Sequence, residues 1–96
     1  MSTDDHDTGN QDTGNARGRA VVDRIEAARF TPVRLRQGYD MSEVDALLDA
    51  VQQAATAGRR IRPLIDGATL RRVRLREGYA IDEVDRFLAD LVLALP

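Results

Sequence analysis

Two stretches of the chain, 40 residues apart, are nearly identical. Residues 33–48 read VRLRQGYDMSEVDALL, and residues 73–88 read VRLREGYAIDEVDRFL. A repeat of this kind indicates that each copy is one supersecondary unit whose apolar face is buried against the other copy. The sequence therefore predicts two units, over residues 19–58 and 59–96, whose half-cores cover each other.

Residues 1–18 differ from the rest of the chain in composition. They read MSTDDHDTGNQDTGNARG, with four Asp and almost no apolar side chain. Such a segment cannot offset its loss of conformational entropy by burying apolar surface. We therefore expect a disordered acidic tail here.

Each copy contains an apolar stripe with the spacing of a helix. The stripes consist of Val44, Leu47, Leu48 and Val51 in the first copy and of Val84, Phe87, Leu88 and Leu91 in the second. This spacing is typical of a helix that buries one face against a partner, and neither stripe is long enough for a coiled coil by itself. We expect the two helices to pack on each other, antiparallel or crossed, within one chain, or on the helices of a second chain.

The segments before these helices alternate apolar and charged residues. Each reads Val-Arg-Leu-Arg, at residues 33–36 and 73–76. In an extended backbone, a period of two sends the valine and the leucine to one face and the arginines to the other. Because no partner strand is evident, we expect extended connectors that lay their apolar side on the neighbouring helix. The predicted fold class is all-α, a tandem repeat of two amphipathic helices, each preceded by an extended connector.

A Gly-Tyr pair joins each connector to its helix. Gly38 and Gly78 suit a positive φ or a close approach of two backbones. Tyr39 and Tyr79 are expected to anchor the edge of the core with their hydroxyls in water.

The start of the first helix carries a capping signal. Asp40, followed three residues later by Glu43, is close to a capping box. The second copy has Ala80 at the place of Asp40 and so lacks this cap.

The sequence contains no recognisable catalytic pattern. In each copy two acids, Glu43 and Asp45 or Glu83 and Asp85, lie two residues apart, so that on a helix they point about 200° apart. The chain has no Cys and a single histidine, His6. Acids near a helix start are favoured by the helix dipole. We therefore predict no enzyme activity, no metal site, no cofactor and no small-molecule substrate.

All 14 basic residues are arginines, and the net charge is −2. Because the tail holds four Asp against one Arg, the remaining residues hold 13 Arg against 12 acids and are nearly neutral. The arginines gather in the connectors, where they either pair with helix carboxylates or contact an anionic surface. The longest apolar run, residues 91–95, is far shorter than the roughly 20 residues that span a bilayer, so any membrane contact is expected to be peripheral.

Residues 30–49 fit the pattern F-x-x-V-R-L-R-x-G-Y-D-x-x-E-V-D-x-x-L-D. This pattern resembles the short domain that opens bacterial DivIVA-type proteins, in particular the repeated form found in small actinobacterial chains. Residues 70–89 resemble it less fully, because Leu70, Ala80 and Ala89 replace Phe, Asp and Asp. The resemblance implies a cytoplasmic, self-associating helical protein. Such a protein recognises the inner face of the membrane at poles or the septum and recruits machinery for division or polar wall growth.

The resemblance also implies contact residues. In that family an apolar side chain with basic neighbours, just before Gly-Tyr, engages the bilayer. The positions that correspond in this chain are Arg34, Leu35, Arg36, Arg74, Leu75 and Arg76. The exposed aromatic that some members place before Gly-Tyr is missing here. Scaffolding members continue into a long coiled coil, and this chain ends at Pro96, so we expect an accessory or adaptor protein.

Two classes of function are therefore considered. The first is a cytoplasmic, non-enzymatic adaptor in bacterial cell division or polar growth. It would bind the anionic inner membrane, a second copy of itself or a larger coiled-coil scaffold. The alternative is a small Arg-rich helical protein that binds nucleic acid or acts as a regulator. A nearly neutral folded part, an acidic tail, and the lack of a helix-turn-helix or an aromatic stacking platform argue against nucleic acid.

Overall fold

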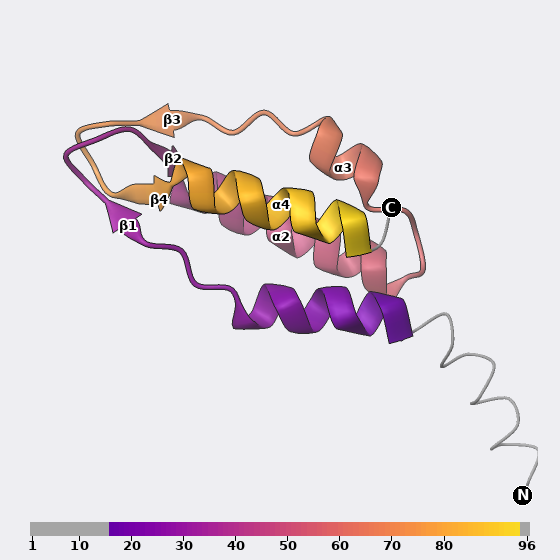
Figure 1. Ribbon diagram of the computed structural model, residues 1–96. Coiled ribbons are helices and arrows are strands. Elements are labelled where there is room, and N and C mark those ends of the chain that lie inside the picture. The colour runs from indigo at the N-terminus through magenta and orange to yellow at the C-terminus, as the bar shows by residue number, and fades with distance from the viewer. Residues whose placement is uncertain (1–15, 95–96) are drawn as a thin grey trace, which may run out of the picture.

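The computed structural model describes residues 16–94 (Figure 1). An N-terminal helix over residues 16–27 is followed by seven labelled elements. These are β1 (Pro32–Val33), β2 (Gly38–Asp40), α2 (Met41–Thr56), α3 (Arg62–Asp66), β3 (Arg72–Val73), β4 (Gly78–Ala80) and α4 (Ile81–Ala94). Each repeat therefore supplies a flanking helix, two short strands and a long helix. Most of the predicted acidic tail lies outside the described residues, and its last three residues, 16–18, are helical.

The connectors form a sheet, so the prediction of an all-α fold is wrong. The four strands are antiparallel in the order β1-β4-β2-β3. Each outer strand pairs with a strand of the other repeat, and in the centre β2 pairs with β4, with Tyr39 opposite Tyr79. The partner that no local pattern revealed therefore comes from the other copy.

The two central strands meet at their glycines. A Cβ atom on Gly78 would lie 2.7 Å from the carbonyl oxygen of Tyr39, and one on Gly38 would lie 2.9 Å from that of Tyr79. Of the two roles expected for these glycines, close backbone approach is the one that the structure shows. The glycine with a positive φ among the described residues is Gly58, at 76°, just after α2.

The long helices leave the sheet on one side and run in the same direction (Figure 1). Their facing stripes form the core, in which Val44, Val51, Val84 and Leu91 are fully buried. The two helices pack on each other within one chain, and of the arrangements considered for them the antiparallel one is wrong. The reason is the antiparallel pairing of β2 with β4, which relates the two repeats by an approximate two-fold axis. Both helices therefore start on the same side of the sheet.

The flanking helices cover the outer sides of this pair. Val21 in the N-terminal helix and Ile61 just before α3 are both fully buried, and they lie 40 positions apart. The flanks differ in length, because the N-terminal helix covers residues 16–27 and α3 has only five residues. The second repeat is therefore less covered than the first.

Candidate functional site

Two loops project from the sheet end of the molecule, away from the helices (Figure 1). Residues 34–37 join β1 to β2, and residues 74–77 join β3 to β4. Their leucines, Leu35 and Leu75, are 92% and 90% exposed. One exposed leucine is ordinary on a protein surface, but the duplication brings two of them to one end.

Each leucine lies between two exposed arginines. The arginines are Arg34, Arg36, Arg74 and Arg76, so the structure gathers all six residues predicted for membrane contact at the sheet end. We call residues 34–37 and 74–77 the tip loops. The expectation that valine and leucine share a buried face is wrong for the leucines. Val33 and Val73 are buried, but the strands end there and the chain bends, so the leucines point outward.

The tyrosines behind the tip loops cross-link the repeats. The Tyr39 hydroxyl donates to Asp85 at 2.8 Å, and the Tyr79 hydroxyl donates to Asp45 at 3.0 Å. Burial, together with these carboxylate acceptors, raises the pKa of both hydroxyls. The hydroxyls are therefore bound to protein rather than left to water, and the aspartates have a role that sequence reasoning missed.

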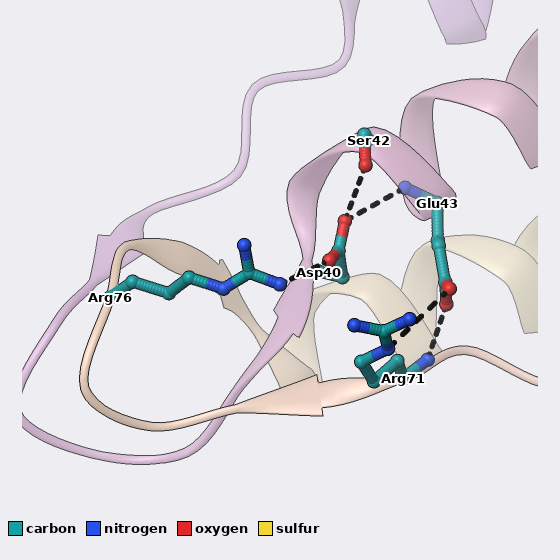
Figure 2. Close-up of polar contacts among 5 residues, drawn as sticks. All are labelled: Asp40, Ser42, Glu43, Arg71 and Arg76. Carbon is teal, nitrogen blue, oxygen red and sulfur yellow. Dashed lines mark hydrogen bonds and ion pairs between the residues drawn. The ribbon is translucent and has the colours of Figure 1, made fainter.

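Two glutamates hold the outer strands. Glu83 accepts hydrogen bonds from the backbone N–H and the hydroxyl of Thr31, at 2.7 and 2.8 Å. Glu43 accepts one from the backbone N–H of Arg71 at 2.6 Å, and Arg71 Nε lies 3.9 Å from its carboxylate (Figure 2). Each glutamate thus binds the other repeat. Only half of the predicted capping box forms, because the backbone N–H of Asp40 donates to the Arg71 carbonyl instead.

Asp40 joins the cap of α2 to one tip loop (Figure 2). Its carboxylate accepts from the Ser42 hydroxyl at 2.6 Å, from the Glu43 backbone N–H at 3.2 Å, and from Arg76 Nη2 at 2.8 Å. The hydrogen bonds from Ser42 and Glu43, with the charge of Arg76, lower the pKa of Asp40. We call the Asp40–Arg76 pair the loop latch.

The second copy has no such latch. The residue that corresponds to Asp40 is Ala80, and Arg36, which corresponds to Arg76, makes no ion pair within the described residues. The two tip loops are therefore alike in their leucines and different in their arginines. Of the two interpretations of the connector arginines, pairing with a carboxylate applies to Arg76 and leaves Arg36 for other contacts.

The site offers two apolar side chains surrounded by cations. Within residues 16–94 no group of three or more His, Cys, Asp or Glu side chains is placed to hold a metal ion. None of the helices in that part of the chain has the length and apolar character needed to cross a bilayer. The tip loops present two exposed leucines and four exposed arginines at one end of the molecule.

Comparison with known proteins leaves the chain without an assigned family. No family model matches it, and no similar curated protein or solved structure was found. The similarity to DivIVA-type domains remains a resemblance carried by the Gly-Tyr motif and its neighbours. The geometry of the tip loops is the observation on which a function can rest.

Proposed function

We propose that this protein is a non-enzymatic module that docks reversibly on an anionic membrane surface through its tip loops. The observation that carries the proposal is the pair of exposed leucines, each between two arginines, at one end of the molecule. The resemblance to DivIVA-type domains supports it, because the same positions engage the bilayer in that family. With that resemblance, we assign the module to bacterial cell division or polar growth, as an adaptor.

The expected strength of docking follows from the side chains. Burying one leucine contributes about 2 kcal/mol, and one arginine near an anionic surface contributes about 1 kcal/mol. Two leucines and the three arginines outside the loop latch would together supply about 7 kcal/mol if both loops engage. This predicts reversible binding that weakens as salt screens the arginines.

The surface for a scaffold partner has to lie elsewhere than on the predicted stripes. The stripe residues of α2 and α4 cover each other in the core of this chain. A scaffold that bound them would have to open that core. The adaptor role therefore needs a second surface, away from both the tip loops and the stripes.

The membrane proposal is tested by co-sedimentation with vesicles of phosphatidylcholine alone or mixed with phosphatidylglycerol, across a salt series. We expect salt-sensitive binding to the anionic vesicles only. The double variant Leu35→Ser/Leu75→Ser should lose at least about tenfold in affinity, because it removes most of the apolar contribution. The matched control is Leu64→Ser/Leu93→Ser, which changes two other exposed leucines away from the tip loops.

Three outcomes would contradict the proposal. These are absence of binding at low salt, full binding by the tip-loop variant, and equal losses in the tip-loop and control variants. Binding to a DNA duplex that the tip-loop variant retains in full would point to contacts between arginines and phosphates. That result would favour the nucleic-acid alternative.

A further inference from the structure

The duplication provides an internal reference for a large groove beside α4. A groove of about 930 Å³ lies between α4 and residues 65–72, and a smaller one of about 430 Å³ lies at the corresponding place beside α2. Every residue that lines the smaller groove has its counterpart, 40 positions away, in the lining of the larger one. We call them the α4 groove and the α2 groove.

An aromatic ring, that of Phe30, occupies part of the α2 groove and lines it. Phe30 lies with its ring centre 5.2 Å from that of Tyr79 and 5.4 Å from that of Phe87. Such tilted and edge-on contacts are the favoured arrangements of aromatic rings. In the α4 groove the counterpart of Phe30 is Leu70, beside Tyr39. A site that holds a ring in the first repeat is therefore left with a smaller side chain in the second.

Two of the other differences replace a polar side chain by an apolar one. Asp49 and Gln52 of the α2 groove are replaced by Ala89 and Val92. At the rim, Leu93 is 80% exposed. The second repeat therefore has more room at this place, and two of its lining positions are apolar where the first repeat has polar side chains.

One cation remains available at the sheet end of the α4 groove. The guanidinium of Arg72 lies 5.9 Å from the centre of the Tyr39 ring, and it makes no ion pair within residues 16–94. The two carboxylates of the groove already have partners. Asp66 forms an ion pair with Arg62 at 3.3 Å, and Asp85 accepts a hydrogen bond from the neutral Tyr39 hydroxyl and keeps its negative charge. An incoming carboxylate could therefore pair with Arg72 at the sheet end, beside the apolar lining.

We propose that the α4 groove binds a segment of a partner protein that presents an aromatic side chain next to a carboxylate. The ring enters beside Leu70 and Tyr39, as the ring of Phe30 does beside Tyr79 in the first repeat, and the carboxylate pairs with Arg72. The groove is lined by residues of α4, by residues 65–72 and by Tyr39. The tip loops project from the sheet away from α4 (Figure 1). The site is thus separate from the proposed membrane contact and provides the second surface that an adaptor needs.

The test uses three matched capped dipeptides titrated into the isotope-labelled protein and followed by NMR. These are acetyl-Glu-Phe-amide, acetyl-Gln-Phe-amide, which lacks the charge, and acetyl-Glu-Ala-amide, which lacks the ring. We expect the first to shift the methyl signals of Leu70, Val92 and Leu93. It should bind at least about fivefold more tightly than either of the others.

Two variants copy residues that the chain itself uses in the α2 groove. Leu70→Phe fills the space as Phe30 does, and Val92→Gln copies Gln52 and keeps the test valid if the first variant fails to fold. Each should weaken acetyl-Glu-Phe-amide at least about fivefold, and Arg72→Gln should reduce it to the affinity of the uncharged probe. Leu35→Ser/Leu75→Ser should bind the probe unchanged, which separates this site from the membrane proposal.

The proposal is overturned if acetyl-Glu-Phe-amide causes no shifts, or if acetyl-Glu-Ala-amide binds as tightly. Shifts confined to the α2 groove, or full binding by both groove variants, would also overturn it. Analytical ultracentrifugation covers the case of a second copy as occupant. A wild-type dimer that Leu70→Phe converts to a monomer would replace the peptide partner with self-association.

Discussion

In the first repeat, Asp40 caps α2 and binds Arg76 of the other repeat. In the second repeat Ala80 stands at the place of Asp40, and Arg36 has no carboxylate partner among residues 16–94. The contacts that hold the outer strands, by contrast, occur twice, each through a glutamate of the opposite copy. The repeats are thus alike in the contacts that hold the outer strands and different in the contact between a helix start and the tip loop of the other repeat. Residues near the two-fold axis contact their own counterparts, so a change in one copy is felt by both.

The largest expected effect concerns the place where the central strands β2 and β4 approach each other most closely, at their glycines. Gly78→Ala would place a Cβ 2.7 Å from the Tyr39 carbonyl oxygen and 2.9 Å from Val73 Cγ2. Because the nearest atom belongs to the backbone of the partner strand, the sheet would have to separate. We expect a loss of about 3 kcal/mol or more in the free energy of unfolding, measured by urea denaturation.

The matched control for this prediction is Gly58→Ala. No atom lies within 4 Å of its Cβ position, and the only penalty is its positive φ of 76°. That penalty is about 1 kcal/mol. Equal losses of unfolding free energy in the two variants would show that steric crowding between β2 and β4 does not decide the stability of the sheet.

The hydrogen bonds that Glu83 and Glu43 accept next to the outer strands should contribute less to stability than the close approach of the glycines. Glu83→Ala removes both acceptors of Thr31, and Glu43→Ala removes the acceptor of the Arg71 backbone N–H. Because these hydrogen bonds are solvent-exposed, each substitution should cost about 1 kcal/mol, with Glu83 the larger of the two. Urea denaturation of both variants measures this cost. A loss of stability in only one of them would show that the two glutamates do not have equivalent roles.

Much of this architecture follows from the sequence, because its signals are local. The apolar stripes of α2 and α4 and the cap at Asp40 depend on residues within a few positions of one another. The offset of 40 also brings Val21 and Ile61 to corresponding buried places.

The sheet is not predictable in this way, because each strand has two or three residues and takes its partners from the other repeat. The period-two pattern predicts an extended connector, and the outward turn of Leu35 depends on the end of β1 at Val33, which the pattern does not mark. The α4 groove is not predictable for a related reason, because it depends on how the two repeats pack together. The substitution of Leu70 for Phe is visible in the sequence, but its consequence appears only when the repeats are superposed.

The loop latch predicts unequal arginines in membrane binding. Arg36→Gln should lower the affinity for anionic vesicles about fivefold, which corresponds to about 1 kcal/mol. Arg76→Gln should have a smaller effect, because Arg76 must first leave Asp40. Asp40→Asn keeps a capping side chain and frees Arg76, so it should increase affinity and make the two arginines equivalent.

Co-sedimentation at low and high salt measures these differences. Circular dichroism of each variant is the control for the cap of α2. Equal effects of Arg36→Gln and Arg76→Gln in the wild-type background would show that the latch does not restrain its loop at a membrane.

The smallest effect concerns the two tyrosines, whose surroundings differ by one cation. Burial and a carboxylate acceptor raise the pKa of both hydroxyls, but Arg72 lies beside Tyr39 and partly opposes this, whereas Pro32 stands opposite Tyr79. A raised pKa means that the neutral hydroxyl is favoured by folding. The associated stability is present below pH about 10 and is lost as the pH rises through the folded-state pKa.

Arg72→Gln should therefore raise the pKa of Tyr39 further and leave that of Tyr79 unchanged. The ultraviolet absorbance of tyrosinate measures both, with Tyr39→Phe and Tyr79→Phe to assign each titration. Both single variants should lose less stability above pH 10 than the wild-type protein. If Arg72→Gln shifted the pKa of both tyrosines equally, Arg72 would act on both rings rather than on Tyr39 alone. The difference between the repeats would then not extend to their tyrosines.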